Sequence, residues 1–317
     1  MDGIPAAGSR PIPGRDDVCV YLRFQEYYNM ITWVDTILQG VMLGGLYALF
    51  AIGLSLMFGV MRLVNVAHGD FVILTAFIGF LIVDTLHLNA FVAMLIVVPL
   101  AFGLGYAVQD GVLTRTIGKD PLPSLVVTFG ISIIIQNLLL ELFSADTRSI
   151  PGGGIETGSI GLGGGLAVGW LPLLTFMAAL TITAAFQWFF SNTRLGRAFR
   201  ATSDDHEAAA LVGVDNRRVY AMATGIAIGI LGVAGILHGM RTTIAPGDGP
   251  AQLIYGFEAV IIGGMGSFWG TFAGGIILGV AQSIGFRVDP GWGILVGHVV
   301  FVTVLLFKPS GLFPKTR

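Results

Sequence analysis

The chain has 317 residues, of which 54% are hydrophobic and only 11% are charged. A soluble domain carries about 25% charged residues, so this composition predicts a protein that crosses a membrane several times. The formal net charge of −2 provides no basic stripe for a nucleic acid. The one cysteine, Cys19, allows neither an intrachain disulfide nor a cysteine metal cluster.

The chain opens with a polar segment, residues 1–34, that lacks the apolar core and the small-residue cleavage site of a secretory signal. We interpret this segment as a polar or interfacial tail. Five segments without Asp, Glu, Lys or Arg follow, and each is long enough for a helix that crosses the bilayer. They are residues 36–61, 88–109, 121–140, 169–190 and 219–240.

Two further regions have the pattern of discontinuous helices. Residues 71–83 form a short apolar run behind a polar sequence, and residues 257–286 are apolar but interrupted by glycines. The basic loop before residues 219–240 and the carboxyl end are expected on the same side of the membrane, so the chain after residue 240 must cross an odd number of times. This is met if the second region makes two passes, 257–266 and 268–285, before a last apolar run at 291–307. The sequence therefore predicts an all-α, polytopic membrane bundle of about eight to nine membrane elements, some of them short or discontinuous.

A hydrophilic loop at residues 191–218 carries five arginines. Because cytoplasmic loops of membrane proteins are rich in Lys and Arg, we expect this loop and the carboxyl-terminal tail, 309–317, to face the cytosol. The bundle itself is expected over residues 35–308. The same count of crossings places the Gly-rich stretch 149–168 outside, as a flexible loop. It also places the amino terminus outside, although the arginines of the tail argue against export of that end.

Glycines recur at the small-xxx-small spacing with which membrane helices pack closely. The pairs are Gly40 and Gly44, Gly225 and Gly229, Gly270 and Gly274, and Gly275 and Gly279. This pattern favours helix-packing contacts over a gating role for any one pair.

Sequence motifs for enzymatic chemistry are absent. The chain has no G-x-x-x-x-G-K-[ST] phosphate-binding loop, no H-E-x-x-H zinc motif and no G-x-S-x-G nucleophile elbow. Its five histidines are scattered without the spacing of metal ligands. We therefore expect no catalytic residue, no metal, no cofactor and no enzymatic activity of its own.

Polar residues at the start of two apolar segments are candidates for a translocation path. Asp70 follows Asn65 and His68, and Glu258 stands near the start of the run at 257–286. A carboxylate at such a position stabilises a helix amino terminus through the helix dipole, which is the simpler interpretation. The functional alternative is that these helix ends line a polar path, as broken helices do in many transporters.

The basic loop contains a second candidate site. Thr202-Ser203-Asp204-Asp205 fits the [ST]-x-x-[DE] pattern of a helix start, and Gly213 fits a helix end. The sequence thus predicts a helix over residues 203–212. Isolated helices below about 12 residues are marginal in water, so this helix needs something to pack against. An interfacial loop helix and a docking helix are both compatible with these residues.

Three blocks of sequence, in this order, are informative together. The first runs from Gly45 into Asn65-Val66-Ala67-His68-Gly69-Asp70-Phe71, and the second joins Gly196-Arg197-Ala198-Phe199-Arg200-Ala201 to Glu207-Ala208-Ala209 and Gly213. The third is Phe257-Glu258-Ala259-Val260-Ile261-Ile262-Gly263-Gly264, followed by Gly270 and Gly274-Gly275. With these blocks the chain resembles the permease subunits of bacterial ABC importers for branched-chain amino acids over most of residues 36–314.

The resemblance implies a helical permease of the bacterial inner membrane that has no ATP site of its own. Its partners would be a second, similar permease, two cytosolic ATPase subunits and a periplasmic substrate-binding protein, with an amino acid as cargo and lipid around the bundle. Motion of the ATPases would reach the bundle through Glu207, Ala208, Ala209 and Gly213, with Arg197 and Arg200 beside them. Asn65, His68, Asp70 and Glu258 would be the candidates for the translocation path.

Alternatives remain for the cargo and for the class of transporter. Related permeases carry urea, short amides or other amino acids, and no residue here distinguishes these cargoes. An ion-coupled secondary transporter is expected to bury ionisable pairs within its spans, and such pairs are scarce in this sequence. A polar extension over about the first 30 residues departs from the pattern typical of the family, outside the three blocks.

Overall fold

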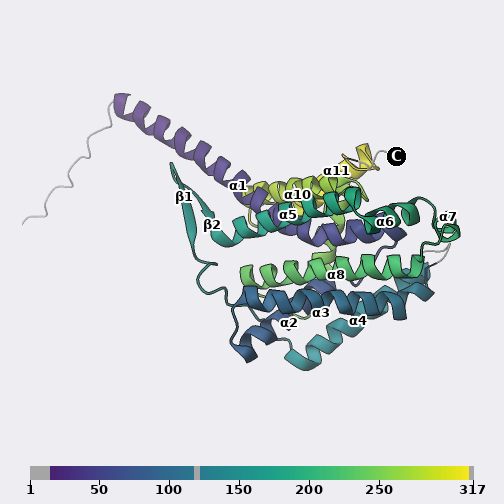
Figure 1. The fold of residues 1–317 in the computed structure, drawn as a ribbon. Helices are drawn as coiled ribbons and strands as arrows, with labels where there is room; N and C mark the ends of the chain where they lie inside the picture. The colour runs from purple at the N-terminus through teal and green to yellow at the C-terminus, as the bar shows by residue number, and fades with distance from the viewer. Residues whose placement is uncertain (1–14, 118–121, 314–317) are drawn as a thin grey trace, which may run out of the picture.

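The computed structural model describes residues 15–117 and 122–313 and is a bundle of helices with one small hairpin (Figure 1). The helices are α1 (Arg15–Met61), α2 (His68–Leu86), α3 (Ala90–Gly111), the 3-10 helix η1 (Leu113–Arg115), α4 (Leu122–Phe143), α5 (Trp170–Asn192), α6 (Arg194–Asp204), α7 (His206–Leu211), α8 (Asn216–Arg241), α9 (Gly249–Gly263), α10 (Phe268–Val288) and α11 (Gly293–Phe307). Two antiparallel strands, β1 (Ser159–Gly163) and β2 (Leu166–Gly169), form the hairpin. The predicted all-α bundle is confirmed.

Seven helices in the described chain are long and apolar enough to cross a membrane. They are Met30–Met61 within α1, α2, α3 together with η1, α4, α5, α8 and α10. Helices α9 and α11 have 15 residues each and are shorter than a perpendicular span requires. The described chain therefore has nine membrane elements, two of them short, in agreement with the predicted eight to nine.

Several predicted boundaries differ from the structure. Helix α1 begins at Arg15, well before the span predicted at 36–61, so residues 15–34 are helical and continuous with that span; residues 1–14 lie outside the described part. The predicted short run at 71–83 belongs to α2, a continuous helix of 19 residues whose first turn contains the polar residues His68 and Asp70. Part of the predicted flexible loop is the β1–β2 hairpin.

The predicted interruption of the segment 257–286 is confirmed. Helix α9 ends at Gly263 and α10 begins at Phe268. The backbone φ angles of Gly264 and Gly266 between them are +106° and +80°, and only glycine adopts such angles without steric cost. However, α9 begins at Gly249, eight residues before the predicted segment, with Pro250 in its first turn, where proline needs no N–H partner.

Helices α1–α2–α3 and α8–α9–α10 repeat one arrangement in opposite directions. Helix α1 packs antiparallel to α10, with Gly40 against Val280 and Gly44 against Ile276. Helix α3 packs antiparallel to α8 in the same way, with Gly105 against Thr224 and Gly225, and Val98 against Gly232. Inverted repeats of this kind are a recurrent architecture of membrane transporters.

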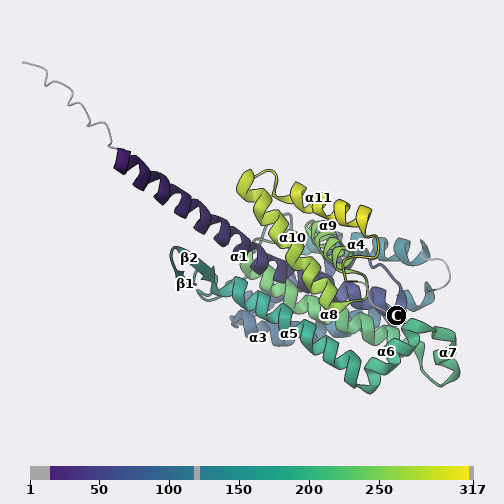
Figure 2. The same cartoon turned by 90° about the horizontal axis from the view of Figure 1, so that it is seen from above.

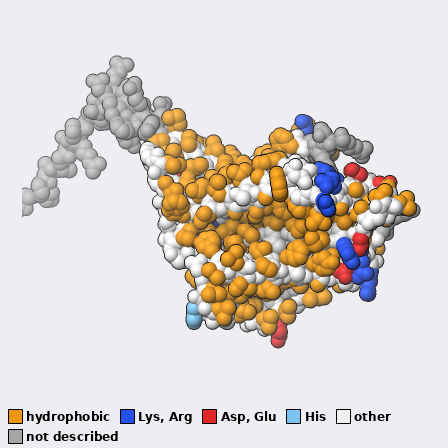
Figure 3. Space-filling model, in the orientation of Figure 1, with side chains coloured by type: hydrophobic (Ala, Val, Ile, Leu, Met, Phe, Trp, Pro, Cys, Tyr) orange, Lys and Arg blue, Asp and Glu red, His pale blue; other side chains and the backbone are white. Residues whose placement is uncertain are grey.

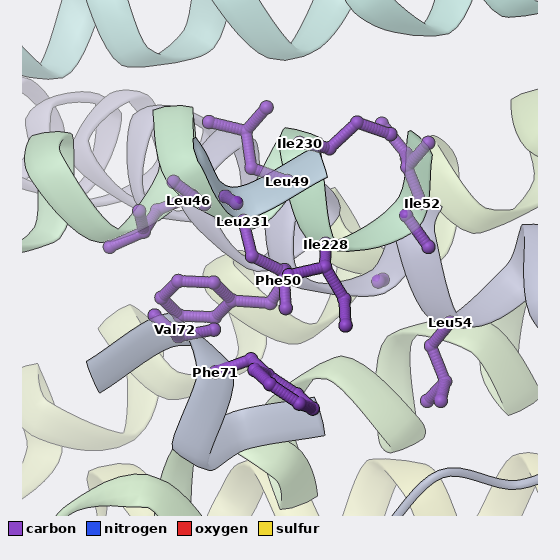
Figure 4. Close-up of a cluster of buried hydrophobic side chains, with 14 of the residues drawn as sticks. Leu46, Leu49, Phe50, Ile52, Leu54, Phe71, Val72, Ile228, Ile230 and Leu231 are labelled. Carbon is purple, nitrogen blue, oxygen red and sulfur yellow. The ribbon is translucent and has the colours of Figure 1, made fainter. Parts of the chain in front are cut away.

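The two remaining helices of the repeats follow the same symmetry. Helix α2 runs alongside α8, with Ala76 near Gly239, and α9 runs alongside α1, with Gly256 against Phe50. The amino termini of α2 and α9 meet, because Gly69 contacts the carbonyl of Gly249. A cluster of buried apolar side chains from α1, α2 and α8, including Phe50, fills the centre of the bundle (Figure 4).

The glycine pairs act as packing contacts in this arrangement. An added Cβ at Gly44 would meet the backbone of α10, and one at Gly279 would meet the backbone of α1 around Gly40 and Gly44. Gly225 faces Phe102 of α3. The packing interpretation of these pairs is confirmed, because the backbones approach closely only where no side chain intervenes.

Candidate functional site

Charged side chains gather at one end of the bundle, where α6 and α7 lie, and the rest of the surface in this view is largely apolar (Figure 3). At this end Arg217, at the start of α8, forms a two-pronged ion pair with Asp110, at the end of α3. Arg217 Nη2 lies 2.9 Å from Asp110 Oδ2, and Arg217 Nε donates to Oδ1. The pair is exposed, so its geometry fixes the two helix ends more than it stabilises the fold.

The helix predicted over residues 203–212 is wrong in its extent, because two helices share this segment. Helix α6 continues to Asp204, and the six-residue α7 begins at His206. Asp205 between them is extended, and its Oδ1 accepts hydrogen bonds from the N–H groups of Glu207 (2.9 Å) and Ala208 (3.0 Å). These N–H groups, that of Ala208 first, hold the pKa of the Asp205 carboxyl below its ordinary value.

The helix start at Thr202 is therefore also wrong. Thr202 lies inside α6, and its hydroxyl donates to Asn216 Oδ1 (3.1 Å) at the start of α8. Asn216 in turn donates from Nδ2 to the carbonyl of His206 (2.6 Å). Asp205 rather than Thr202 caps the helix that follows, and the contacts of Asn216 that hold this segment are not visible in the local pattern.

The end predicted at Gly213 is confirmed. Its φ angle is +88°, and the N–H groups of Gly213 and Val214 donate to the carbonyls of Ala210 and Ala209, both at 3.0 Å. These bonds satisfy carbonyls at the end of α7 that lack partners within the helix, and they need a residue in the left-handed region.

Most predicted coupling residues are exposed. On α7, Glu207 and Ala208 are exposed, whereas Ala209 is buried against the rest of the bundle. Leu211 and Val212 are 89% and 80% exposed, so two branched apolar side chains project at the tip of this small helix. Such an apolar projection on a polar loop indicates a contact surface.

Helix α6 anchors this surface to the bundle. Its buried Phe199 stacks on Phe190 of α5 with ring centroids 5.3 Å apart. Arg197 points away from this contact and is exposed, while Arg200 is half-buried. The buried and exposed residues therefore lie on opposite sides of α6, as expected of an amphipathic helix on a membrane surface.

A hydrogen bond connects α6 to the end of α1, because Ser203 Oγ donates to the carbonyl of Gly59. Next to this bond lies a cleft of about 880 Å³. Its walls come from the end of α1 and the following residues through Val64, from the α6–α7 junction, and from the ends of the neighbouring helices. Helix α6 thus joins α7 to the last turn of α1, just before the chain between α1 and α2.

Two of the predicted path residues, Asn65 and His68, lie where the chain turns from α1 into α2. His68 Nε2 lies 2.9 Å from the carbonyl of Phe50, and Asn65 Oδ1 accepts from the N–H of Ala67 (3.1 Å). Both side chains are only 1% exposed. These contacts fix the turn from α1 into α2, while Asn65 Nδ2 and His68 Nδ1 make no hydrogen bond within the described chain.

Asp70 occupies the first turn of α2 and is also buried. Its Oδ1 accepts a hydrogen bond from Gln136 Nε2 of α4 (2.9 Å), and its carboxylate contacts Gly249 at the start of α9. Helix capping alone does not describe this residue, since it joins three helices. Gln136 was not singled out by the sequence, although the amide pair Gln136-Asn137 within an apolar span is a signal for such a contact.

Glu258 is the tenth residue of α9, so its predicted role as a cap at a helix start is wrong. Its side chain is 4% exposed and forms a hydrogen-bonded pair with His298 Nδ1 of α11, whose side chain is 40% exposed. The two carboxylates thus follow one rule. Each lies on the middle helix of one repeat, α2 or α9, and binds a polar side chain of another helix.

Among the residues that the structure describes, no three His, Cys, Asp or Glu side chains are grouped in a way that could hold a metal ion. Other buried polar pairs connect helices to each other, including Tyr47 with Gln282 (2.5 Å), Thr224 with Gln109 (2.7 Å) and Thr271 with Ser55 (2.9 Å). Each pair satisfies groups that hydrocarbon would leave without partners.

An inverted repeat with an interruption between α9 and α10, an apolar perimeter and one charged end with a projecting helix define the class as a multi-pass membrane transport protein. The family profile described as "Branched-chain amino acid transport system / permease component" matches residues 36–305. The chain therefore belongs to this family, and the resemblance seen in the three sequence blocks is confirmed.

Curated relatives agree with this assignment. The chain is 29% identical over 299 residues to the high-affinity branched-chain amino acid transport system permease protein BraD of Pseudomonas aeruginosa, covering 89% of this chain and 96% of BraD. It is 28% identical over 305 residues to the protein of the same description, LivH, of Escherichia coli K12, covering 90% and 97%. A second E. coli permease of that description, LivM, is 29% identical over 125 residues, covering 39% and 29%.

Proposed function

We propose that this chain is the membrane-spanning permease subunit of an ABC importer that moves branched-chain amino acids across a bacterial inner membrane. Its membership of the permease family and its similarity to BraD and LivH over about nine-tenths of its length support this cargo. Urea, a short amide or another amino acid is the alternative cargo. ATP is hydrolysed by separate subunits in this proposal.

One structural observation carries the coupling role: a capped helix, α7, projects from the charged end and is tied through α6 to the end of α1. We assign that end to the cytosol because it carries the basic residues of the loop, among them Arg197 and Arg217. Glu207, Ala208, Leu211 and Val212 present the surface toward an ATPase subunit, while Ala209 and Gly213 shape α7. Arg197 and Arg200 lie on the neighbouring α6.

The partners in this proposal are a second permease, two ATPase subunits and a periplasmic binding protein. E. coli has two permease proteins of the same description, LivH and LivM, and both are similar to this chain, which supports a pair of different subunits. Asp70 and Glu258 stay as candidates for the translocation path. Asn65 and His68 act on that path indirectly, by holding the turn between α1 and α2.

The proposal is tested by reconstitution into proteoliposomes with the partner permease, the ATPases and the binding protein. Uptake of labelled leucine is measured with and without internal ATP. We expect ATP-dependent uptake that is lost in Glu207→Lys, whereas Asp84→Lys, an equal charge reversal at an exposed position in the last turn of α2, retains it.

The other outcomes separate the alternatives. ATP-dependent uptake of urea or another amino acid, with no uptake of leucine, would keep the importer and replace its cargo. Uptake by this chain alone under an ion gradient would overturn the proposal in favour of a secondary transporter. Normal uptake by Glu207→Lys would overturn the coupling role of α7.

A further inference from the structure

Helix α4 is buried on a polar side and exposes large apolar side chains. Ser124, Thr128 and Ser132 are buried and lie four residues apart, so they occupy one side of the helix. Val126 and Ile133 are among the apolar side chains that it exposes. The helix lies at the edge of the bundle and packs on α2 (Figure 1). Over its first three turns, the described buried side chains of α4 are therefore all hydroxyl groups.

These hydroxyl groups bind segments outside their own turn. The contacts are those of Ser124 Oγ with Thr116 Oγ1 (3.0 Å), of Thr128 Oγ1 with the N–H of Val66 (3.2 Å) and of Ser132 Oγ with Gln136 Nε2 (3.1 Å). Gln136 Nε2 also donates to the carboxylate of Asp70. A hydrogen bond through a bridging water is nearly as favourable as a direct one, so water can enter such an interface at little cost, unlike one of packed apolar side chains.

Helix α5 provides a comparison. Its Thr175 and Thr183 are also buried, but their hydroxyls donate to the carbonyls of Leu171 (2.8 Å) and Ala179 (2.7 Å), one turn earlier in the same helix. These bonds need no partner outside α5. Buried hydroxyl groups on an outer helix therefore do not indicate water by themselves, and the contacts of α4 with other segments distinguish it.

Polar groups without a partner lie next to α4, in the connection 62–67 and at the start of α2. In the part of the chain that the structure describes, the N–H groups of Leu63, Val64 and Asn65 make no hydrogen bond. The same holds for two buried side-chain atoms, Asn65 Nδ2 and Asp70 Oδ2. Irregular backbone at membrane depth is tolerated where protein buries it or where it lines a water-filled cavity. These donors and this acceptor are therefore suited to bind water.

The cleft of about 880 Å³ at the charged end provides an entrance for water. Val64 of the connection and Ser124 of α4 both line it. Gln136 is 12 residues beyond Ser124, or about 18 Å along a helix, which is more than half of the hydrocarbon thickness of about 30 Å. The buried polar side of α4 thus leads from the cleft to Asp70 deep within the membrane.

We propose that water enters from the cleft between α4 and the connection 62–67 and reaches Asp70, where α2 and α9 meet. The hydroxyl groups of Ser124, Thr128 and Ser132 bind this water. It allows α2 and α9 to change their contacts without leaving the carboxylate of Asp70 buried and unpaired. This passage lies within one subunit, its ligand is water, and it rests on the proposed function only for the side of the membrane from which water enters.

Cysteine accessibility tests the passage. In a Cys19→Ser background, single cysteines replace Ser124, Thr128 and Ser132 in the assembled importer, and Ag⁺ is added at the charged end. The thiolate is the form of cysteine that binds a metal ion, so a thiol reacts where water reaches it. The remaining thiols are counted after denaturation. We expect all three positions to react, at rates that fall with depth.

Two matched controls separate water from burial and from lipid. Thr183→Cys replaces an equally buried threonine of α5, and Ile133→Cys lies next to Ser132 on the exposed side of α4. We expect both to react at least tenfold more slowly than Thr128→Cys. Equal rates at positions 128 and 183 would overturn the proposal, as would an unreactive position 132.

A further variant tests the order of the hydroxyl groups. Thr128→Val keeps the shape of the side chain and removes the hydroxyl. We expect the cysteine at position 132 to react at least fivefold more slowly in this background and the cysteine at position 124 to be unaffected. Thr183→Val, the same change on α5, should alter neither rate. An equal change at positions 124 and 132 would indicate a general distortion and would overturn the role of Thr128.

The accessibility measurement needs neither ATP nor cargo. If leucine uptake fails but positions 128 and 132 react from the charged end, the cargo is wrong and the passage stands. If leucine uptake succeeds and these positions are unreactive, the proposed function stands and the interface of α4 is dry. Reaction only from the opposite end of the molecule would overturn the entry of water through the cleft.

Discussion

The two connections that precede α2 and α9, residues 62–67 and residues 242–248, occupy equivalent places in the inverted repeat but belong to opposite ends of the molecule. The first is tied to the charged end, because Ser203 of α6 binds the carbonyl of Gly59 just before it. The second is tied to the opposite end, because the backbones of Ile244 and Arg148 form a β-bridge with N–O distances of 2.8 and 2.9 Å.

This difference shows how an inverted repeat can serve alternating access. Asp70 follows the first connection and touches Gly249 at the end of the second, so both connections reach one point within the membrane. The two connections, each tied to a different end of the protein, therefore lead to the same junction of α2 and α9. Four predictions, from the largest expected effect to the smallest, test this comparison.

The largest effect is expected where the repeat is assembled. Gly279→Leu places a side chain against the backbone of α1 at Gly40 and Gly44. Overpacking of a core typically costs about 1–3 kcal/mol, and a backbone cannot move aside as a side chain can. We therefore expect loss of monodisperse protein in size-exclusion chromatography.

Gly103→Leu on α3 is the matched control, since no atom lies within 4 Å of a Cβ added there. This variant should elute as wild type. Normal elution of Gly279→Leu would show that the contact between α1 and α10 is less rigid than the structure indicates.

The second prediction concerns the projecting tip of α7. Leu211→Asp places a charge on a side chain that is 89% exposed, so the fold should be unaffected. Loss of an apolar anchor of an interface costs about 2 kcal/mol or more, which corresponds to at least a tenfold loss of ATP-dependent uptake. Wild-type uptake would show that the ATPases contact another part of the charged end.

A matched control for this variant lies on α5. Ser191→Asp changes an exposed polar residue in the last turn of α5, at the same end of the bundle. We expect Ser191→Asp to transport normally.

The third prediction separates the two connections. Ser203→Ala removes the hydrogen bond to Gly59, and Arg148→Pro removes the N–H that donates to Ile244. A single hydrogen bond contributes about 1 kcal/mol, so each variant should lower uptake about fivefold. We expect Ser203→Ala to hydrolyse ATP without matching uptake, and Arg148→Pro to lose stimulation of the ATPase by loaded binding protein. The same defect in both variants would contradict the assignment of one connection to each end.

Sequence reasoning found the helices whose signals are local. Long uncharged runs, glycine interruptions and the end of α7 at Gly213 were predicted, because length, hydropathy and a positive φ angle at glycine act within one segment. The start of α7 was missed because Asn216, ten residues after His206, holds the segment. The start of α9 was missed because Gly249, its first residue, packs against Asp70, which is far away in sequence.

The site follows the same division. Asp70 and Glu258 were identified as unusual charges in apolar segments, which is a property of the sequence alone. Their partners, Gln136 and His298, lie on other helices. They can be identified only from the structure, in which α4 packs on α2 and α11 packs on α9. The roles of Asp70 and Glu258 in transport are still predictions.

The smallest effect is expected at the cap of α7. The N–H groups of Ala208 and Glu207 lower the pKa of Asp205 in the folded state, so the ionised cap stabilises α7 above the ordinary pKa of an aspartate. This stabilisation is lost only as the pH falls through the lowered pKa. Between pH 8 and pH 5 we expect no change in the protection of residues 206–211 from amide hydrogen exchange, with loss of protection in more acidic solution.

Asp205→Ala should show the reduced protection at every pH, several-fold below wild type, whereas Asp205→Asn, which also accepts the two hydrogen bonds, should retain protection and lose its dependence on pH. If wild-type protection changed between pH 8 and pH 5, a group other than Asp205 would control α7, and the charged end would respond to pH independently of this cap.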